Sequence, residues 1–219
     1  MINFYKLECS TEKEEIGWYP QLKSLWIAST DYWGPESYTN TPLEGRIGFD
    51  IVFPKFDLEE NAKLTDYVST GALTGDFFVI SDRLLTIFQG FKMDEYQHFP
   101  IEVGTPDGSV SYNIIYFPFP RTNDIIDWRS SIFKRMLPNG EVAIEFFENA
   151  RSYNLAKNIH ELQAEKLVIH APKLALFDIF RLKWYKSGIY ISERLKLAME
   201  ESRITGVRFE EAEWLSMDF

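Results

Sequence analysis

The sequence predicts an α+β fold: a strand-rich mixed sheet with a few short capped helices, a pattern that also allows two lobes. Short apolar runs bounded by turn residues outnumber segments with helical spacing. Strands and helices do not alternate regularly along the chain, which argues against a doubly wound α/β fold. Two segments combine an apolar run, a Ser and then apolar residues at helical spacing, which predicts two capped helices.

The first third of the chain is predicted to form an acidic, strand-rich lobe, residues 1–70. Residues 71–219 form the predicted α+β core, and the linker between the two contains Gly71 and Gly75. Residues 1–70 hold 12 acidic and 6 basic residues, whereas residues 71–219 hold 21 and 17. The predicted elements of the first part are strands over 2–9, 24–28 and 48–53 and a short acidic helix over Leu58–Leu64.

In the second part, alternation and turn residues set most of the predicted elements. The strands are expected at 77–80, 99–103, 110–117, 142–147, 166–170, 177–182, 189–191 and 207–209. Helical spacing begins after Ser81 and again after Ser192, and a single helical turn is expected over Glu161–Lys166.

One seven-residue pattern occurs twice, as FVISDRL at residues 78–84 and as IYISERL at residues 189–195. In both copies an apolar strand runs into Ser, an acidic residue, Arg and Leu. Ser is a good N-cap, and an acidic residue in the first turn interacts favourably with the helix dipole. A catalytic Ser would need a His partner, and neither Ser lies in a G-x-S-x-G motif. The repeat is therefore interpreted as one strand-to-helix junction written twice.

Composition narrows the possible partners. The net charge of −10, from 23 basic and 33 acidic residues, argues against nucleic acid and against an anionic membrane surface. It favours a basic protein partner. The single cysteine, Cys9, cannot form an intrachain disulfide, and no secretory leader or membrane-spanning run is recognisable, so a cytoplasmic location is expected.

No cofactor or metal site is expected, because the chain has no phosphate-binding glycine motif and no His or Cys at metal-ligand spacing. Acidic pairs such as Glu14-Glu15 and Glu200-Glu201 leave a carboxylate-based glycoside hydrolase open as an alternative. A regulatory binding module without catalytic activity is another possibility.

Several segments together resemble a known family. They are FFVISDRLLTIF at 77–88, FPIEV at 99–103, DIIDW at 124–128 with Ser131, DIFRL at 178–182, IYISERLKLAM at 189–199 and ITGVRF at 204–209. This set resembles the eleventh numbered family of immunity proteins from bacterial polymorphic toxin systems, over about residues 75–210. The resemblance implies a protein without catalytic residues that binds and neutralises a cognate toxin encoded beside it.

Two stretches outside these motifs are candidate toxin contacts, because aromatic anchors beside charges are typical of binding hot spots. The predicted interface residues are Tyr32, Trp33, Glu36, Glu210, Glu211, Glu213 and Trp214. Packing of Trp33 and Trp214 in the core is the alternative for these two residues.

Overall fold

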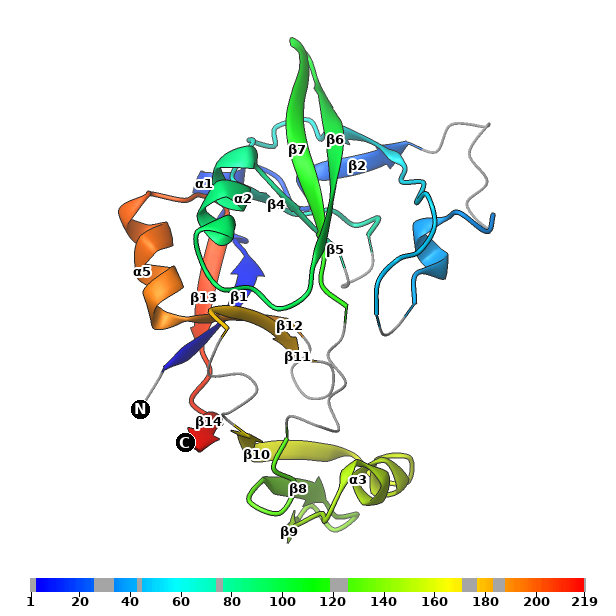
Figure 1. The fold of residues 1–219 in the computed structure, drawn as a ribbon, viewed down its shortest axis with the longest axis vertical. Coiled ribbons are helices and arrows are strands. Elements are labelled where there is room, and N and C mark those ends of the chain that lie inside the picture. Colours follow the sequence, from blue (N-terminus) through cyan, green and yellow to red (C-terminus); the bar gives the residue numbers. More distant parts are fainter. Residues whose placement is uncertain are drawn as a thin grey trace.

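The computed structural model describes residues 3–25, 34–42, 45–73, 77–118, 126–170, 177–182 and 188–218. Its strands form three sheets, two of four strands and one of six (Figure 1). Parallel and antiparallel pairs both occur, since β3 and β10 each have a parallel neighbour. The predicted α+β fold with mixed sheets is confirmed.

The first sheet forms the middle layer of the molecule. Its strands lie in the order β11 (Ile179–Leu182), β12 (Gly188–Ser192), β1 (Phe4–Cys9), β13 (Val207–Glu211). All three pairs are antiparallel. β1 thus lies between two strands from the last 32 residues of the 219-residue chain.

The six-stranded sheet lies above the first sheet in Figure 1. Its order is β2 (Leu22–Leu25), β3 (Lys55–Leu58), β6 (Gln97–Thr105), β7 (Gly108–Tyr116), β5 (Phe77–Ile80), β4 (Tyr67–Val68). The first 70 residues therefore contribute strands to two sheets, and each sheet is shared with later residues. The division into a lobe of residues 1–70 and a core of residues 71–219 stays a prediction.

The third sheet lies below the first in Figure 1. Its order is β14 (Leu215–Asp218), β10 (Leu162–His170), β8 (Ile132–Met136), β9 (Val142–Glu145). The helix α3 (Ala150–Lys157) accompanies this sheet, and its Tyr153 packs on Phe133 of β8, with ring centroids 5.0 Å apart.

Three apolar clusters hold these layers together. In β12, Tyr190 belongs to the cluster shared with the third sheet, while Ile189 and Ile191 belong to the cluster shared with the helices α2 (Asp82–Gln89) and α5 (Glu193–Glu201). Successive strand residues point to opposite faces, so the middle sheet is buried on both sides. The third cluster covers the far face of the six-stranded sheet and includes Phe56, Val79 and Ile114.

The two capped helices appear where the sequence predicts them, as α2 and α5. Three smaller predictions are wrong. Residues 48–53 are not a strand: Val52 forms only an isolated bridge with Ser37, and the strand β3 begins at Lys55. Residues 58–64 are not a helix: β3 ends at Leu58, and Asn61 has a φ of 66°, which is incompatible with a right-handed helix. Residues 161–166 belong largely to β10, where Leu162 and Ala164 point inward and their neighbours are exposed.

Two short helices were not expected. The first is α1 (Lys13–Ile16). The second, α3, begins with a capping box, in which the Asn149 side chain accepts from the Ser152 N–H at 3.0 Å and the Ser152 hydroxyl contacts the Asn149 N–H at 3.3 Å.

Candidate functional site

The repeated seven-residue pattern forms the strand-to-helix junctions β5–α2 and β12–α5. Ser81 Oγ accepts a hydrogen bond from the Leu84 N–H at 3.2 Å, and Ser192 Oγ accepts one from the Leu195 N–H at 3.3 Å. Both serines have extended backbone and stand directly before the helix. The predicted N-caps are confirmed at both positions.

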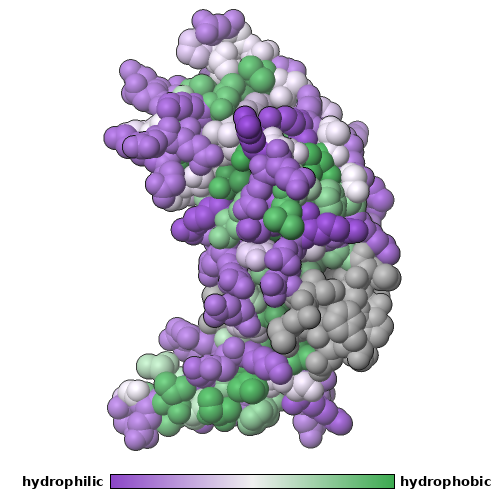
Figure 2. All heavy atoms as spheres, turned by 90° about the vertical axis from the view of Figure 1, so that its left-hand side faces the viewer, coloured by the Kyte–Doolittle hydropathy of each residue, from purple (hydrophilic) through white to green (hydrophobic). Residues whose placement is uncertain are grey.

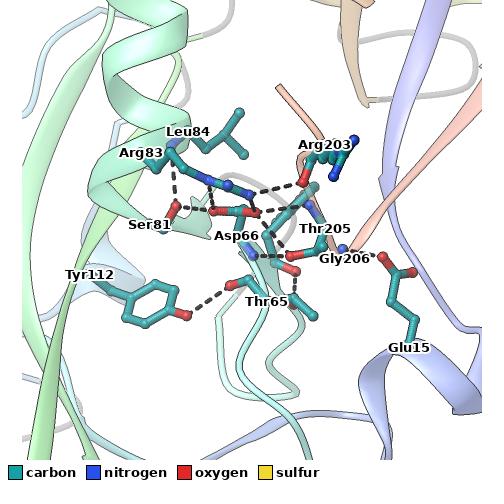
Figure 3. Close-up of polar contacts among 11 residues, drawn as sticks. Glu15, Thr65, Asp66, Ser81, Arg83, Leu84, Tyr112, Arg203, Thr205 and Gly206 are labelled. Atoms are coloured by element: carbon teal, nitrogen blue, oxygen red, sulfur yellow. Dashed lines mark hydrogen bonds and ion pairs between the residues drawn. The ribbon is translucent and has the colours of Figure 1, made fainter. Parts of the chain in front are cut away.

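A buried aspartate completes the first junction (Figure 3). Asp66, which is 7% exposed, accepts from Ser81 Oγ at 2.7 Å. Arg83 forms a bidentate pair with the same carboxylate, through Nε at 3.0 Å and Nη2 at 2.5 Å. We call Asp66, Ser81 and Arg83 the first Asp–Ser–Arg cluster.

The second junction reproduces this geometry almost atom for atom. Asp178, 5% exposed, accepts from Ser192 Oγ at 2.7 Å, from Arg194 Nε at 3.1 Å and from Arg194 Nη2 at 2.5 Å. In both clusters the serine N–H also donates to the aspartate carbonyl at 2.8 Å. These three residues form the second Asp–Ser–Arg cluster, and the pair of clusters indicates an internal structural repeat.

Each cluster also binds the segment that follows the helix of the other cluster. Thr205, which follows α5, donates its N–H to Asp66 Oδ2 at 2.9 Å. Lys92, which follows α2, donates its N–H to Asp178 Oδ2 at 3.1 Å. The two junctions are therefore connected reciprocally: each aspartate binds the serine and arginine of its own junction and a backbone N–H that follows the helix of the other junction.

The hydrogen bonds control the ionisation of the two aspartates. Burial by itself raises the pKa of Asp66, but hydrogen bonds from Arg83, Thr205 and Ser81 outweigh burial and lower it to about 2. The same opposition, with Arg194 as the strongest bonding partner, lowers the pKa of Asp178. Both carboxylates are ionised at neutral pH, and their hydrogen bonds go to the serine, arginine and backbone groups that form the two junctions.

The only thiol of the chain is also a poor nucleophile. Burial raises the pKa of Cys9 to about 12, against a smaller lowering by a hydrogen bond with Tyr67. A thiolate is the reactive form of cysteine, so Cys9 is protonated at neutral pH.

The interface candidates that the structure describes lie in two separate places. Glu36 is exposed and lies before η1 (Tyr38–Asn40), on the right in Figure 1, whereas β13 and β14 lie on the left. Tyr32 and Trp33 lie outside the described residues.

Among the C-terminal candidates, Glu211 and Glu213 are exposed and Glu210 is half-buried. Trp214 is half-buried against the apolar cluster below the middle sheet, with its ring 5.6 Å from that of Tyr190. Its contact role stays a prediction, and the structure gives this side chain a packing role as well.

A model of the immunity protein family Imm11 matches residues 3–213. The chain belongs to this family. The match extends well beyond the segments 75–210 that carry the sequence resemblance, because it includes β1, α1, β2 and β3. No curated protein matches the chain.

For an immunity protein, exposed apolar side chains are candidate partner contacts, and the sequence interpretation missed two groups of them. Trp18 and Tyr19 are 52% and 57% exposed beside the acidic helix α1. The second group lies on β8 and β9, and the alternation VAIEF at 142–146 is the signal that could have found it. None of the helices that the structure describes is long and apolar enough to cross a bilayer.

Proposed function

We propose that this protein binds a cognate toxin, encoded beside it, and neutralises the toxin by stoichiometric occlusion in the cytoplasm. The observation that carries this proposal is the family match, which spans residues 3–213 of 219. An inhibitor that acts by occlusion needs a stable surface complementary to its target, and its own side chains need perform no chemistry.

The acidic and hydroxyl side chains that could take part in catalysis instead contact the chain's own backbone and side chains. This arrangement supports the proposal. The aspartates, serines and arginines of the two clusters bind one another. Of the acidic pairs that suggested a hydrolase, Glu15 accepts from the Gly206 N–H at 2.7 Å and Glu200 pairs with Lys196 at 2.8 Å. These contacts favour a binding role over a carboxylate-based hydrolase.

The charge distribution supports a basic toxin. The net charge is −10, and the exposed carboxylates of Glu211 and Glu213 lie beside Glu210 at the end of β13 and just after it. Complementary charge steers two proteins together and can raise association to about 10⁸ M⁻¹s⁻¹ at low salt.

The test uses the purified toxin domain encoded by the neighbouring gene. Isothermal titration should give a complex with a stoichiometry of one to one, and toxin activity should fall in proportion to the amount of complex. A toxin domain from an unrelated system is the control and should not bind. Protection at a large molar excess of toxin would indicate turnover and refute occlusion. Failure of the folded protein to bind would refute the proposal as a whole.

A further inference from the structure

The strand β9 lies at the edge of the third sheet. The strand order β14–β10–β8–β9 leaves one side of β9 open, and among the described strands it pairs with β8 alone. An open edge presents unpaired N–H and C=O groups to any extended segment that approaches it.

The register shows which backbone groups of β9 are open. The hairpin between β8 and β9 is closed by a hydrogen bond from the Leu137 N–H to the Glu141 carbonyl at 2.8 Å. In an antiparallel pair, residues alternate between bonding the partner strand and pointing away from it. Ala143 and Glu145 therefore bond to β8, while the N–H and C=O groups of Val142 and Ile144 point to the open side.

The outer face of the same hairpin is mostly apolar, and its Lys134 forms an ion pair with Glu165. Met136 pairs with Val142 and Lys134 pairs with Ile144, so these side chains share one face. Met136, Val142 and Ile144 are 52%, 50% and 51% exposed.

Phe146, which continues the alternation on this face, is 62% exposed. Figure 2 shows apolar surface gathered over the lower part of the molecule, the part that contains this sheet. An exposed apolar patch beside an open strand edge is typical of a protein–protein contact.

We propose that the toxin adds an extended segment to β9 as a new edge strand and covers the outer face of the hairpin. This inference rests on the proposed function and specifies its contact surface. The main-chain hydrogen bonds would supply binding energy, and side chains at alternate positions of the added strand would pack beside Val142, Ile144 and Phe146.

The acidic residues at the two ends of β9 indicate the charge expected on the added segment. Glu141 and Glu148 are exposed and flank the strand, which favours basic residues on both sides of the apolar part of the added segment. A second copy of this chain fits less well, because each copy carries a net charge of −10 and brings the same two acids to the edge.

The variant that decides between these possibilities removes one backbone N–H on the open side of β9 and keeps the pairing of β9 with β8. Ile144→Pro removes an N–H that faces the open side, and proline is tolerated at such edge positions. Ile144→Ala is the matched control, since it loses the same side chain but keeps the N–H. With the toxin domain of the neighbouring gene as the probe, Ile144→Pro should bind about tenfold more weakly than Ile144→Ala.

Two further variants separate the apolar face from the edge. Met136→Ala should weaken binding severalfold, because its side chain lies on the outer face. Ile159→Ala, which truncates an apolar side chain that is 75% exposed and outside β9, should bind like the wild type. Melting curves establish that each variant is folded.

Amide hydrogen exchange gives an independent measurement on the wild-type complex. The amides of Val142 and Ile144 should exchange at least about tenfold more slowly when toxin is bound, whereas Ala143 and Glu145, already bonded to β8, should change little. A wild-type protein that fails to bind toxin refutes the proposed function. A wild type that binds without protecting these amides, with equal affinity for the Pro and Ala variants, refutes strand addition alone. Protection of the same amides in the isolated chain, together with sedimentation as a dimer, would assign the edge to a second copy.

Discussion

Replacing Asp66 with Ala tests whether the first Asp–Ser–Arg cluster holds the fold together. The carboxylate accepts five hydrogen bonds, from Ser81 Oγ, from Nε and Nη2 of Arg83, and from N and Oγ1 of Thr205. Without it, Thr205 in the segment after α5 loses two hydrogen bonds, and the backbone bond from the Tyr67 N–H to the Thr205 carbonyl at 3.1 Å is left to hold this segment to the start of β4.

The expected loss of folding free energy is about 3 kcal/mol at neutral pH. Hydrogen bonds to a charged group contribute about 1.5–3 kcal/mol each, but their contributions are not additive. The Arg83 side chain is 53% exposed and can be hydrated after the change, so most of the loss falls on Ser81 and Thr205. Asp50→Ala, which removes an exposed carboxylate, should change the free energy of unfolding by less than about 0.5 kcal/mol.

The loss should also depend on pH. The pKa of Asp66 is lowered on folding from 3.8 to about 2, so its stabilisation is present above pH 3.8 and is lost as the pH falls toward 2. This lowering corresponds to at most about 2.5 kcal/mol, and screening at Arg83 reduces it to about 1–2 kcal/mol. Urea unfolding at pH 7 and near pH 2 measures both values. A variant as stable as the wild type at pH 7, or a difference that does not change with pH, would refute the role of the cluster.

Four further outcomes are expected. Ser192→Ala removes both a helix cap and a bond to Asp178, so it should cost about 1–2 kcal/mol in thermal or urea unfolding and leave toxin protection intact at permissive temperature. Ser81→Ala should behave in the same way, and loss of protection without a change in melting temperature in either variant would contradict the structural role. Neutralising Glu210, Glu211 and Glu213 together should slow association and flatten its salt dependence in surface plasmon resonance, and a wild-type rate at low salt would exclude steering by this segment. Trp33→Ala should weaken toxin binding by about 2 kcal/mol or more with an unchanged melting curve, and unfolding of this variant would instead place Trp33 in the core.

The parts of the fold that depend on neighbouring residues follow from the sequence. The caps at Ser81 and Ser192 lie within three residues of the amides they bind, and the apolar runs that make β5, β7 and β12 span only a few positions. The turn between β6 and β7 follows in the same way from Thr105-Pro106-Asp107-Gly108.

The long-range contacts do not follow from such local patterns. β1 is a convincing strand by alternation, but nothing in residues 4–9 indicates that it lies between β12 and β13. The aspartates of the two clusters precede their serines by 15 and 14 residues, so a search confined to one motif passes over them. Placing the two copies of the repeat side by side would have found them, because in each copy an Asp stands directly before the preceding strand.

The distribution of these contacts separates the residues that hold the fold from those with few structural constraints. The two Asp–Ser–Arg clusters join the middle sheet to α2, α5 and the start of β4, and the residues that form them have little freedom to change without loss of stability. The outer face of β8 and β9 and the acidic end of β13 carry few such constraints, because their side chains are largely exposed. If the toxin binds at these places, as proposed, substitutions there change partner contacts at little cost to the fold. Discrimination between toxins is then expected to concentrate at the open edge of the third sheet and at the acidic end of β13.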